Sequence, residues 1–428
     1  MVLEKGFLLK HLMAISDGPF SGTGFGEELR HVLFGLAQTK KFDITWQSLQ
    51  HFGYPTAIPD TMFADMEHVG SAVKLYSGTQ GDVQNFGADC FLKNYREINP
   101  EMVLFMGDPR NIAGYRNLKT QLGFPLIFYT TLDGLPIHPA MTEHLNFSNV
   151  IVTMTEWAQK EYQKVGFYPA MIHHGINSKW WNVSKEEKYE TRRAHGIPDD
   201  VTVYINWDVP QHRKRPDALA RCWRDFIGVN KDKKAILIWY SDWNMGRSLG
   251  YNIEALLKQY EVPRENIIDP ITVQGSPKYW DRAETPEQLR KIASMADVYL
   301  STTSGEGFGK CGLEAMAMGI PVVITDYSAC SEVHQKGSIL VPCYEGRAGR
   351  YRMDDRRRSV EAGIVNEEKF VEAMNYLYED ENRRRKLGAE AKVWASTFDY
   401  EKCIIPEWQR LLGGLDTSLI AAKELLNL

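Results

Sequence analysis

The chain has 428 residues, of which 43% are hydrophobic and 25% are charged, so it can bury a large core and is expected to form two domains. Its formal net charge of −5 lacks the strong basic excess of a nucleic-acid binder. Basic runs at residues 354–359 and 381–386 lie beside acidic residues, which favours a solvated helix or loop face. No stretch is apolar over the length that spans a bilayer, so at most peripheral membrane contact is expected.

The six cysteines are scattered, without Cys-x-x-Cys spacing or a partner histidine cluster, which is typical of reduced thiols in the cytosol. In residues 1–18, Lys10 and His11 interrupt a short apolar run and no small-residue cleavage site follows. We interpret this stretch as a first strand rather than a signal peptide, and we expect a cytoplasmic protein.

Short apolar runs alternate with longer helical patterns along most of the chain, which is typical of βαβ units and a mainly parallel sheet. The strands predicted in the first half are residues 7–15, 102–107, 125–131 and 149–154. The pattern restarts in the second half, with strands predicted at residues 201–206, 235–241, 298–303 and 320–325. Two successive α/β domains account for this order.

A polar segment at residues 173–200 separates the two series and carries Gly175, Gly196 and Pro198. A linker there would let the two halves close on a ligand. The expected domains are residues 1–174 and 175–404, with residues 405–428 forming terminal helices that pack back on the N-terminal domain.

The first glycine-rich turn follows the first strand and precedes an amphipathic helix that begins near Glu27. Its glycines are Gly18, Gly22, Gly24 and Gly26. Glycines there allow positive φ and bring a ligand close to backbone N–H groups at a helix N-terminus. The spacing is not Gly-x-Gly-x-x-Gly with an acidic residue about twenty positions on. A ligand-binding loop and a tight strand-to-helix turn are therefore equal alternatives.

The stretch SGEGFGKCGLEAMAMGIPVV at residues 304–323 indicates a ligand site more strongly. Alternate glycines flank Glu306 and expose backbone donors at the start of a helix predicted at residues 310–318, and such donors suit phosphate oxygens and sugar hydroxyls. Glu314 lies about one turn into that helix, where it could accept two hydrogen bonds from a ribose diol while Glu306 meets a second polyhydroxyl group. Two acids in a buried-looking helix are costly unless each is bonded, so a purely structural pair is disfavoured.

The segment EGFGKCGLEAMAMGIPVVITD resembles the E-x7-E signature of retaining glycosyltransferases with the GT-B fold, in the large family 4 group, also called group 1. Residues 148–177 are similar to that family's last N-domain unit and crossover, and residues 367–404 resemble its C-terminal helices. The resemblance implies an α/β protein with two Rossmann-like domains that face each other across a crevice. The acceptor would bind mainly to the N-terminal domain and the nucleotide sugar mainly to the C-terminal domain.

Carried over residue by residue, the resemblance implies that Glu306 contacts the donor sugar and Glu314 the ribose. Lys214 matches the lysine of the family's diphosphate clamp. Trp207 stands where the clamp arginine is expected, so Arg213 or Arg215 would substitute for it. The other donor-binding candidates are Gly22 and Gly24 in the first turn and the backbone of Phe308, Gly309 and Lys310.

Asp133 follows a predicted strand where many relatives carry a His-Asp pair, and here the pair reads Leu132-Asp133. Asp133 either faces the reaction centre or caps the turn with Gly134. The catalytic candidates implied by the resemblance are Glu306, Asp133 and Lys214.

The implied function is retaining transfer of a sugar from a nucleoside diphosphate sugar to a hydroxyl of a sugar, a lipid-linked or a protein acceptor, with no nucleic-acid partner and no cofactor. No metal requirement is expected, because the sequence contains no Asp-x-Asp pair to hold a hard cation. The alternatives are a catalytically silent sugar-nucleotide-binding regulator and a GT-B sugar-nucleotide epimerase. A starch or glycogen synthase is a further same-fold alternative, but its Lys-x-Gly-Gly-Leu loop is missing here.

Overall fold

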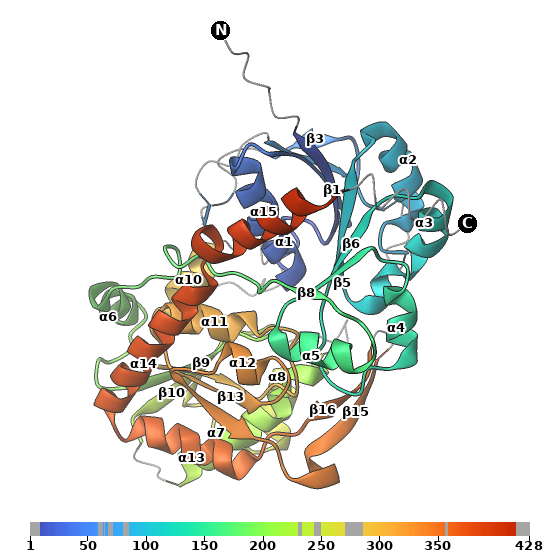
Figure 1. Ribbon diagram of the computed structural model, residues 1–428. Helices are drawn as coiled ribbons and strands as arrows, with labels where there is room; N and C mark the ends of the chain where they lie inside the picture. The colour runs from blue at the N-terminus through green and yellow to red at the C-terminus, as the bar shows by residue number, and fades with distance from the viewer. Residues whose placement is uncertain are drawn as a thin grey trace. The chain divides into compact units, whose positions relative to one another are not determined.

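The computed structural model describes residues 9–58, 63, 65–66, 72–79, 85–229, 233–243, 250–269, 286–355 and 358–416. The chain divides into two compact units, which Figure 1 shows coloured from the N-terminus to the C-terminus. The N-terminal unit comprises Met1–Thr131, Ile137–Gly175 and Asp399–Leu428, and the C-terminal unit comprises Leu132–Pro136 and Ile176–Phe398.

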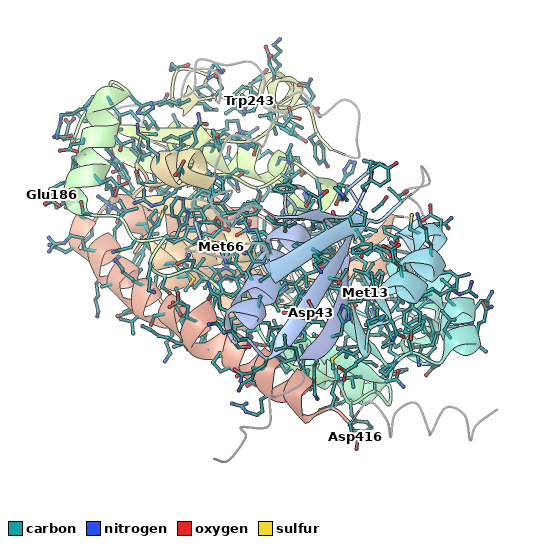
Figure 2. All side chains as sticks on the ribbon, turned by 90° about the horizontal axis from the view of Figure 1, so that it is seen from above. Met13, Asp43, Met66, Glu186, Trp243 and Asp416 are labelled. Carbon is teal, nitrogen blue, oxygen red and sulfur yellow. The ribbon has the colours of Figure 1, made fainter. Side chains whose placement is uncertain are left out.

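The N-terminal unit is built on an eight-stranded sheet with the order β3-β4-β2-β1-β5-β6-β7-β8, parallel except for the β3–β4 pair. Its strands are β1 (Lys10–Ser16), β2 (Phe42–Ser48), β3 (Thr56–Ala57), β4 (Val73–Ser77), β5 (Met102–Gly107), β6 (Leu126–Thr130), β7 (Val150–Thr153) and β8 (Ala170–Met171). The central strands are continuous apolar runs because parallel strands are covered on both faces. Met13 of β1, for example, is fully buried among packed side chains (Figure 2).

Among the described residues, the helices of the N-terminal unit are α1 (Gly24–Gln38), α2 (Ala88–Ile98), the 3₁₀ helix η3 (Pro109–Tyr115), α3 (Arg116–Leu122), α4 (Pro139–Leu145), α5 (Glu156–Lys164), the π-helix η7 (Tyr400–Ile404) and α15 (Ile405–Gly414). Helix α1 begins at Gly24, within the first glycine-rich stretch and three residues before the expected Glu27, because the Thr23 hydroxyl caps it by accepting a hydrogen bond from the Gly26 amide at 3.1 Å.

The chain returns to the N-terminal unit at Asp399, earlier than the expected boundary at residue 405. A buried carboxylate explains this position. Glu28 accepts hydrogen bonds from the Tyr400 hydroxyl and from the Gly175 amide. Further along, Trp408 of α15 packs edge-on against Tyr129, with ring centroids 4.9 Å apart. The helix predicted for the last ten residues lies outside the described residues.

The C-terminal unit contains a six-stranded parallel sheet with the order β11-β10-β9-β12-β13-β14. Its strands are β9 (Thr202–Asn206), β10 (Ala235–Trp239), β11 (Ile267–Ile268), β12 (Val298–Ser301), β13 (Val322–Asp326) and β14 (Ser338–Pro342). Its helices are α6 (Lys185–Ala194), the 3₁₀ helix η4 (His212–Lys214), α7 (Pro216–Gly228), α8 (Ile253–Gln259), α10 (Pro286–Ala293), α11 (Lys310–Ala317), α12 (Cys330–Val333), the 3₁₀ helix η5 (Gly346–Gly349), α13 (Glu367–Tyr378) and α14 (Glu381–Ala395), followed by the 3₁₀ helix η6 (Ser396–Phe398).

The expectation of a helix or loop at residues 354–359 is wrong for the four of them that the structure describes, because 354–355 and 358–359 lie in the paired antiparallel strands β15 (Arg350–Asp355) and β16 (Arg358–Gly363). The hairpin buries apolar side chains on one face: Met353 pairs with Val360, both are at most 7% exposed, and Ala362 is fully buried. The other basic run, at residues 381–386, lies in α14 as a helix.

The hairpin also explains why Leu132–Pro136 group with the C-terminal unit. The Glu361 amide donates to the Leu135 carbonyl at 2.6 Å. A Cβ atom on Gly134 would lie 2.4 Å from the Glu361 carbonyl oxygen, so the two backbones approach as closely as glycine allows.

Candidate functional site

Two segments meet beyond the carboxyl ends of β9 and β12, which are neighbours in the parallel sheet. One is η4, which follows β9, and the other is the glycine-rich loop between β12 and α11. The Ser304 amide and hydroxyl both donate to the Arg213 carbonyl, at 2.6 and 2.8 Å. This edge of an open α/β sheet is where ligands generally bind.

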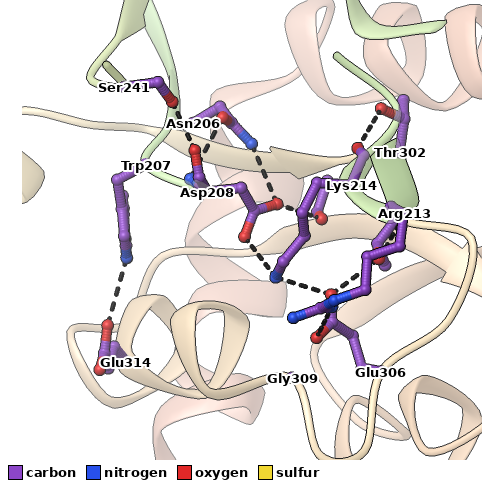
Figure 3. A network of polar contacts seen from close by, with 12 residues as sticks. Asn206, Trp207, Asp208, Arg213, Lys214, Ser241, Thr302, Glu306, Gly309 and Glu314 are labelled. Carbon is purple, nitrogen blue, oxygen red and sulfur yellow. Dashed lines mark hydrogen bonds and ion pairs between the residues drawn. The ribbon is translucent and has the colours of Figure 1, made fainter. Parts of the chain in front are cut away.

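Glu306 is buried at the centre of this meeting point, with 5% of its surface exposed. Its Oε2 lies 2.6 Å from Nη1 of Arg213, and its Oε1 lies 2.6 Å from Nζ of Lys214 (Figure 3). The Thr303 hydroxyl also donates to Oε1, at 2.7 Å. One carboxylate is thus held by two cations from η4 and by a hydroxyl of its own loop.

The electrostatics of this cluster keep all three groups charged. Burial by itself would raise the pKa of Glu306, but Arg213 and Lys214 outweigh it and hold that pKa at about 2. Burial would lower the pKa of Lys214, but Asp208 and Glu306 raise it above its usual range. The pKa of Arg213 is raised in the same way, against burial, by Glu306 and by Asp133.

Asp208 is a member of the cluster that the sequence analysis missed. Its Oδ1 lies 2.8 Å from Nζ of Lys214, and its Oδ2 accepts a hydrogen bond from the Ser301 hydroxyl at 2.6 Å. Lys214 therefore bridges two buried carboxylates, and the charges of Arg213, Lys214, Asp208 and Glu306 sum to zero. The available signal was a charged residue almost directly after a predicted strand, at the edge where ligands bind.

Trp207 contacts the second acid of the motif. Its indole Nε1 donates to Oε2 of Glu314 at 3.2 Å (Figure 3), and its ring packs on Tyr299 with centroids 4.5 Å apart. Glu314 lies in α11 and is 4% exposed. Trp207, at the position where an arginine is expected, thus binds Glu314, the carboxylate that is predicted to contact the ribose.

The glycine loop is shaped by His334, which the sequence analysis also missed. Gly309 caps α11 with φ of 93°, and a Cβ there would lie 2.6 Å from Cε1 of His334. A Cβ on Gly312 would lie 2.3 Å from Nε2 of the same ring. His334 Nε2 is 3.1 Å from the Gly309 carbonyl oxygen, so the buried imidazole fits only beside glycines.

We expect acid to destabilise the fold in two steps, and His334 accounts for the first. Burial lowers the pKa of His334 to about 4 from its usual 6.5, so unfolding takes up a proton in this range. The contribution of neutral His334 to the free energy of unfolding is fully present above pH 6.5, and the free energy of unfolding falls by on the order of 3 kcal/mol as the pH drops towards about 4. Glu306, with its pKa lowered from 4.5 to about 2, adds a further loss below pH 4.5.

Urea unfolding between about pH 7.5 and pH 3.5 measures this dependence. The His334→Gln variant should lose the first step and keep the second. A variant with the same slope as the parent above about pH 4.5 would contradict the assignment of that step to His334.

The remaining predicted residues are placed as follows. Asp133 is buried in the C-terminal unit and acts electrostatically on Arg213. Arg215 does not reach Glu306 in the way Arg213 does: its guanidinium binds Asp217 through Nε and Nη2 at 2.9 and 2.8 Å. Of the other candidates, Phe308 is buried, and Lys310 is the half-buried first residue of α11. Gly22 and Gly24 lie in the N-terminal unit, at the start of α1.

Comparisons with known proteins agree with this architecture. A sucrose-phosphate synthase from Thermosynechococcus elongatus superposes with a TM-score of 0.70 at 15% identity, over 96% of this chain and 100% of that one. Anabaena Alr3699/HepE in complex with UDP and glucose gives a TM-score of 0.65 at 14% identity, over 95% and 100% of the two chains. The two α/β units with parallel sheets therefore define a GT-B fold.

Residues 282–394 match the family described as glycosyl transferases group 1. The lipopolysaccharide core biosynthesis mannosyltransferase LpsB of Rhizobium meliloti is 29% identical over 171 residues, which are 39% of this chain and 43% of that protein. The chain thus matches less than half the length of this curated relative. Both matches support a group 1 glycosyltransferase. None of the helices in the described ranges has the length and hydropathy needed to cross a membrane.

Proposed function

We propose that the protein is a retaining glycosyltransferase that moves a sugar from a nucleoside diphosphate sugar to an acceptor hydroxyl. The observation that carries the proposal is the buried carboxylate of Glu306, held by Arg213 and Lys214 at the start of α11. A buried acid with two cations beside a glycine-rich helix start offers both partners that a sugar diphosphate needs: acceptors for hydroxyls and donors for phosphate oxygens.

In the proposed reaction, Arg213 and Lys214 bind the diphosphate in place of Glu306, and the released carboxylate accepts hydrogen bonds from the donor sugar. Asp208 keeps Lys214 at the site during this exchange, because its contact lies on the other side of the ammonium group. The acceptor oxygen attacks the anomeric carbon on the face of the leaving group as the bond to the diphosphate breaks, and the proton of the acceptor hydroxyl passes to the departing phosphate oxygen. The two cations and the amides of the glycine loop stabilise the charge that develops on the departing phosphate.

The nucleotide-sugar donor is supported by a neighbour of the same fold, whose structure holds UDP and glucose. We propose a sugar, a lipid-linked molecule or a protein as the acceptor. We also propose a cytoplasmic location, because the six cysteines are scattered without Cys-x-x-Cys spacing, a pattern typical of reduced thiols.

A thermal-shift screen of UDP, GDP, ADP and their sugars tests the proposal. One nucleoside diphosphate should raise the melting temperature, because a ligand that binds only the folded state stabilises it. The same sugar nucleotide should release free sugar slowly when incubated with the protein. Stabilisation without sugar release or transfer to any acceptor would instead support a catalytically silent binder. Conversion of the sugar nucleotide into its epimer would support an epimerase.

We expect transfer to persist in excess EDTA. The sequence has no Asp-x-Asp pair, and the phosphate charge can be met by Arg213, Lys214 and the start of α11. The measurement is initial rate with and without chelator, with a dialysed sample as the control. Complete loss of activity on chelation, restored by Mn²⁺, would contradict this expectation.

A further inference from the structure

A pocket of about 240 Å³ lies in the C-terminal unit, and none of its described lining residues belongs to the cluster around Glu306. Three structural elements that are distant in sequence form it: η4 with the start of α7, the residues before α8, and the β15–β16 hairpin with the residue that follows it. Its lining residues are His212, Arg215, Asp217, Tyr251, Tyr351 and Ile364.

Two consecutive residues, Lys214 and Arg215, contribute to different sites: Lys214 to the cluster around Glu306 and Arg215 to the pocket. Lys214 directs its ammonium group to Asp208 and Glu306, whereas Arg215 directs its guanidinium to Asp217, which lines the pocket. Arg215 adopts a left-handed backbone conformation with φ of 50°. A bulky side chain rarely adopts this conformation, and such strain persists where the surroundings impose it, often at ligand sites.

The charge around the pocket is balanced: Arg215 pairs with Asp217, and Arg221, which also contacts Asp217 at 3.1 Å, pairs with Glu367. Nε and Nη2 of Arg215 bind the two carboxylate oxygens of Asp217, at 2.9 and 2.8 Å. A planar pair of this kind leaves no net charge from these two residues, yet it still presents polar edges to a ligand. A phosphate would meet the Asp217 carboxylate beside the arginine, so the lining disfavours a small anion.

Aromatic rings form much of the remaining wall. The ring of His212 packs edge-on against Tyr251, with centroids 4.7 Å apart, and the guanidinium of Arg215 lies 5.8 Å from the centre of the Tyr351 ring. The hydroxyls of Tyr351 and Ser304 are hydrogen-bonded at 2.6 Å, which anchors this wall to the glycine-rich loop. Tyrosine presents an apolar face and a polar tip to a ligand.

We propose that this pocket binds one neutral sugar ring, separate from the donor site. A sugar combines apolar C–H faces, which fit the tyrosine rings, with hydroxyls, which can both donate to Asp217 and accept from Arg215. The pocket volume of about 240 Å³ is below the roughly 300–1,000 Å³ that is typical for drug-sized ligands, so it suits one sugar ring better than a whole nucleotide. The inference depends on the pocket alone and not on the proposed transfer reaction.

Saturation-transfer difference NMR with the methyl α-glycosides of glucose, galactose and mannose tests this site. At least one glycoside should show saturation of its ring protons at millimolar concentration. The Tyr251→Ala variant should lose most of that signal, because it removes one aromatic wall. Tyr168→Ala is the matched control, because Tyr168 is 82% exposed and lies in the other unit. Circular dichroism checks that both variants fold.

The inference would be overturned if none of the three glycosides showed saturation, if Tyr251→Ala gave the same signal as the parent, or if inorganic phosphate displaced the glycoside. Excess UDP and the Lys214→Ala substitution should leave the signal unchanged. If UDP removes the signal, the glycoside is at the donor site and the second pocket is not a sugar site. If no nucleotide binds but the signal persists, the proposed function fails while this inference stands.

Discussion

Replacing Glu306 with glutamine is expected to lower the rate of sugar transfer by about 100-fold or more, while nucleoside diphosphate binding becomes tighter rather than weaker. The two effects have opposite signs because Glu306 has two partners in succession. In the structure its carboxylate holds Arg213 and Lys214, and a diphosphate must displace it from both cations. The neutral amide competes less for these cations, but it also loses the charged contact with the donor sugar.

Calorimetric titration of the nucleoside diphosphate and initial rates of transfer separate the two effects. Glu390→Gln is the matched control, because Glu390 is exposed on α14. We also expect Glu306→Gln to melt at a lower temperature without ligand, because breaking a buried pair leaves cations uncompensated. Unchanged turnover would remove Glu306 from the site, and weaker diphosphate binding would contradict the exchange of partners.

Replacing Lys214 with alanine is expected to weaken nucleoside diphosphate binding by about 1.5–3 kcal/mol, the range for a hydrogen bond to a charged group. Lys214 is buried between Asp208 and Glu306, so its loss leaves two carboxylates close together with Arg213 as their counter-charge. The repulsion between these carboxylates and the incoming phosphates adds to the loss of the ammonium group.

The measurement is again calorimetric, and Lys258→Ala on α8 is the control, because its ion pair with Glu254 is exposed. Lys214→Arg should recover part of the affinity, since it restores the charge but not the compact ammonium geometry. Equal affinity in Lys214→Ala and the parent would assign the diphosphate to Arg213 alone. Arg215 is a poorer candidate for that role, since Asp217 binds its guanidinium.

Local patterns in the sequence determined much of the fold. The prediction of a strand at residues 102–107 agrees with β5, and the helix predicted from residue 310 agrees with the start of α11. These elements are predictable because a strand buried on both faces needs a continuous apolar run, and because a glycine-rich stretch marks the turn that precedes the helix. The positions of Glu306 and Glu314 at a helix start also follow from the spacing alone.

The partners of these residues were decided by tertiary structure. Asp208 reaches Ser301, and Gly309 reaches His334, across contacts that join neighbouring strands and helices far apart in the sequence. Whether Arg213 or Arg215 lies beside Glu306 depends on the direction of each side chain at η4. Arg215 ends that turn with a left-handed backbone conformation, and its side chain binds Asp217 instead. Residue type and spacing carry no record of that direction, because it arises only when the turn packs against the glycine loop and the hairpin.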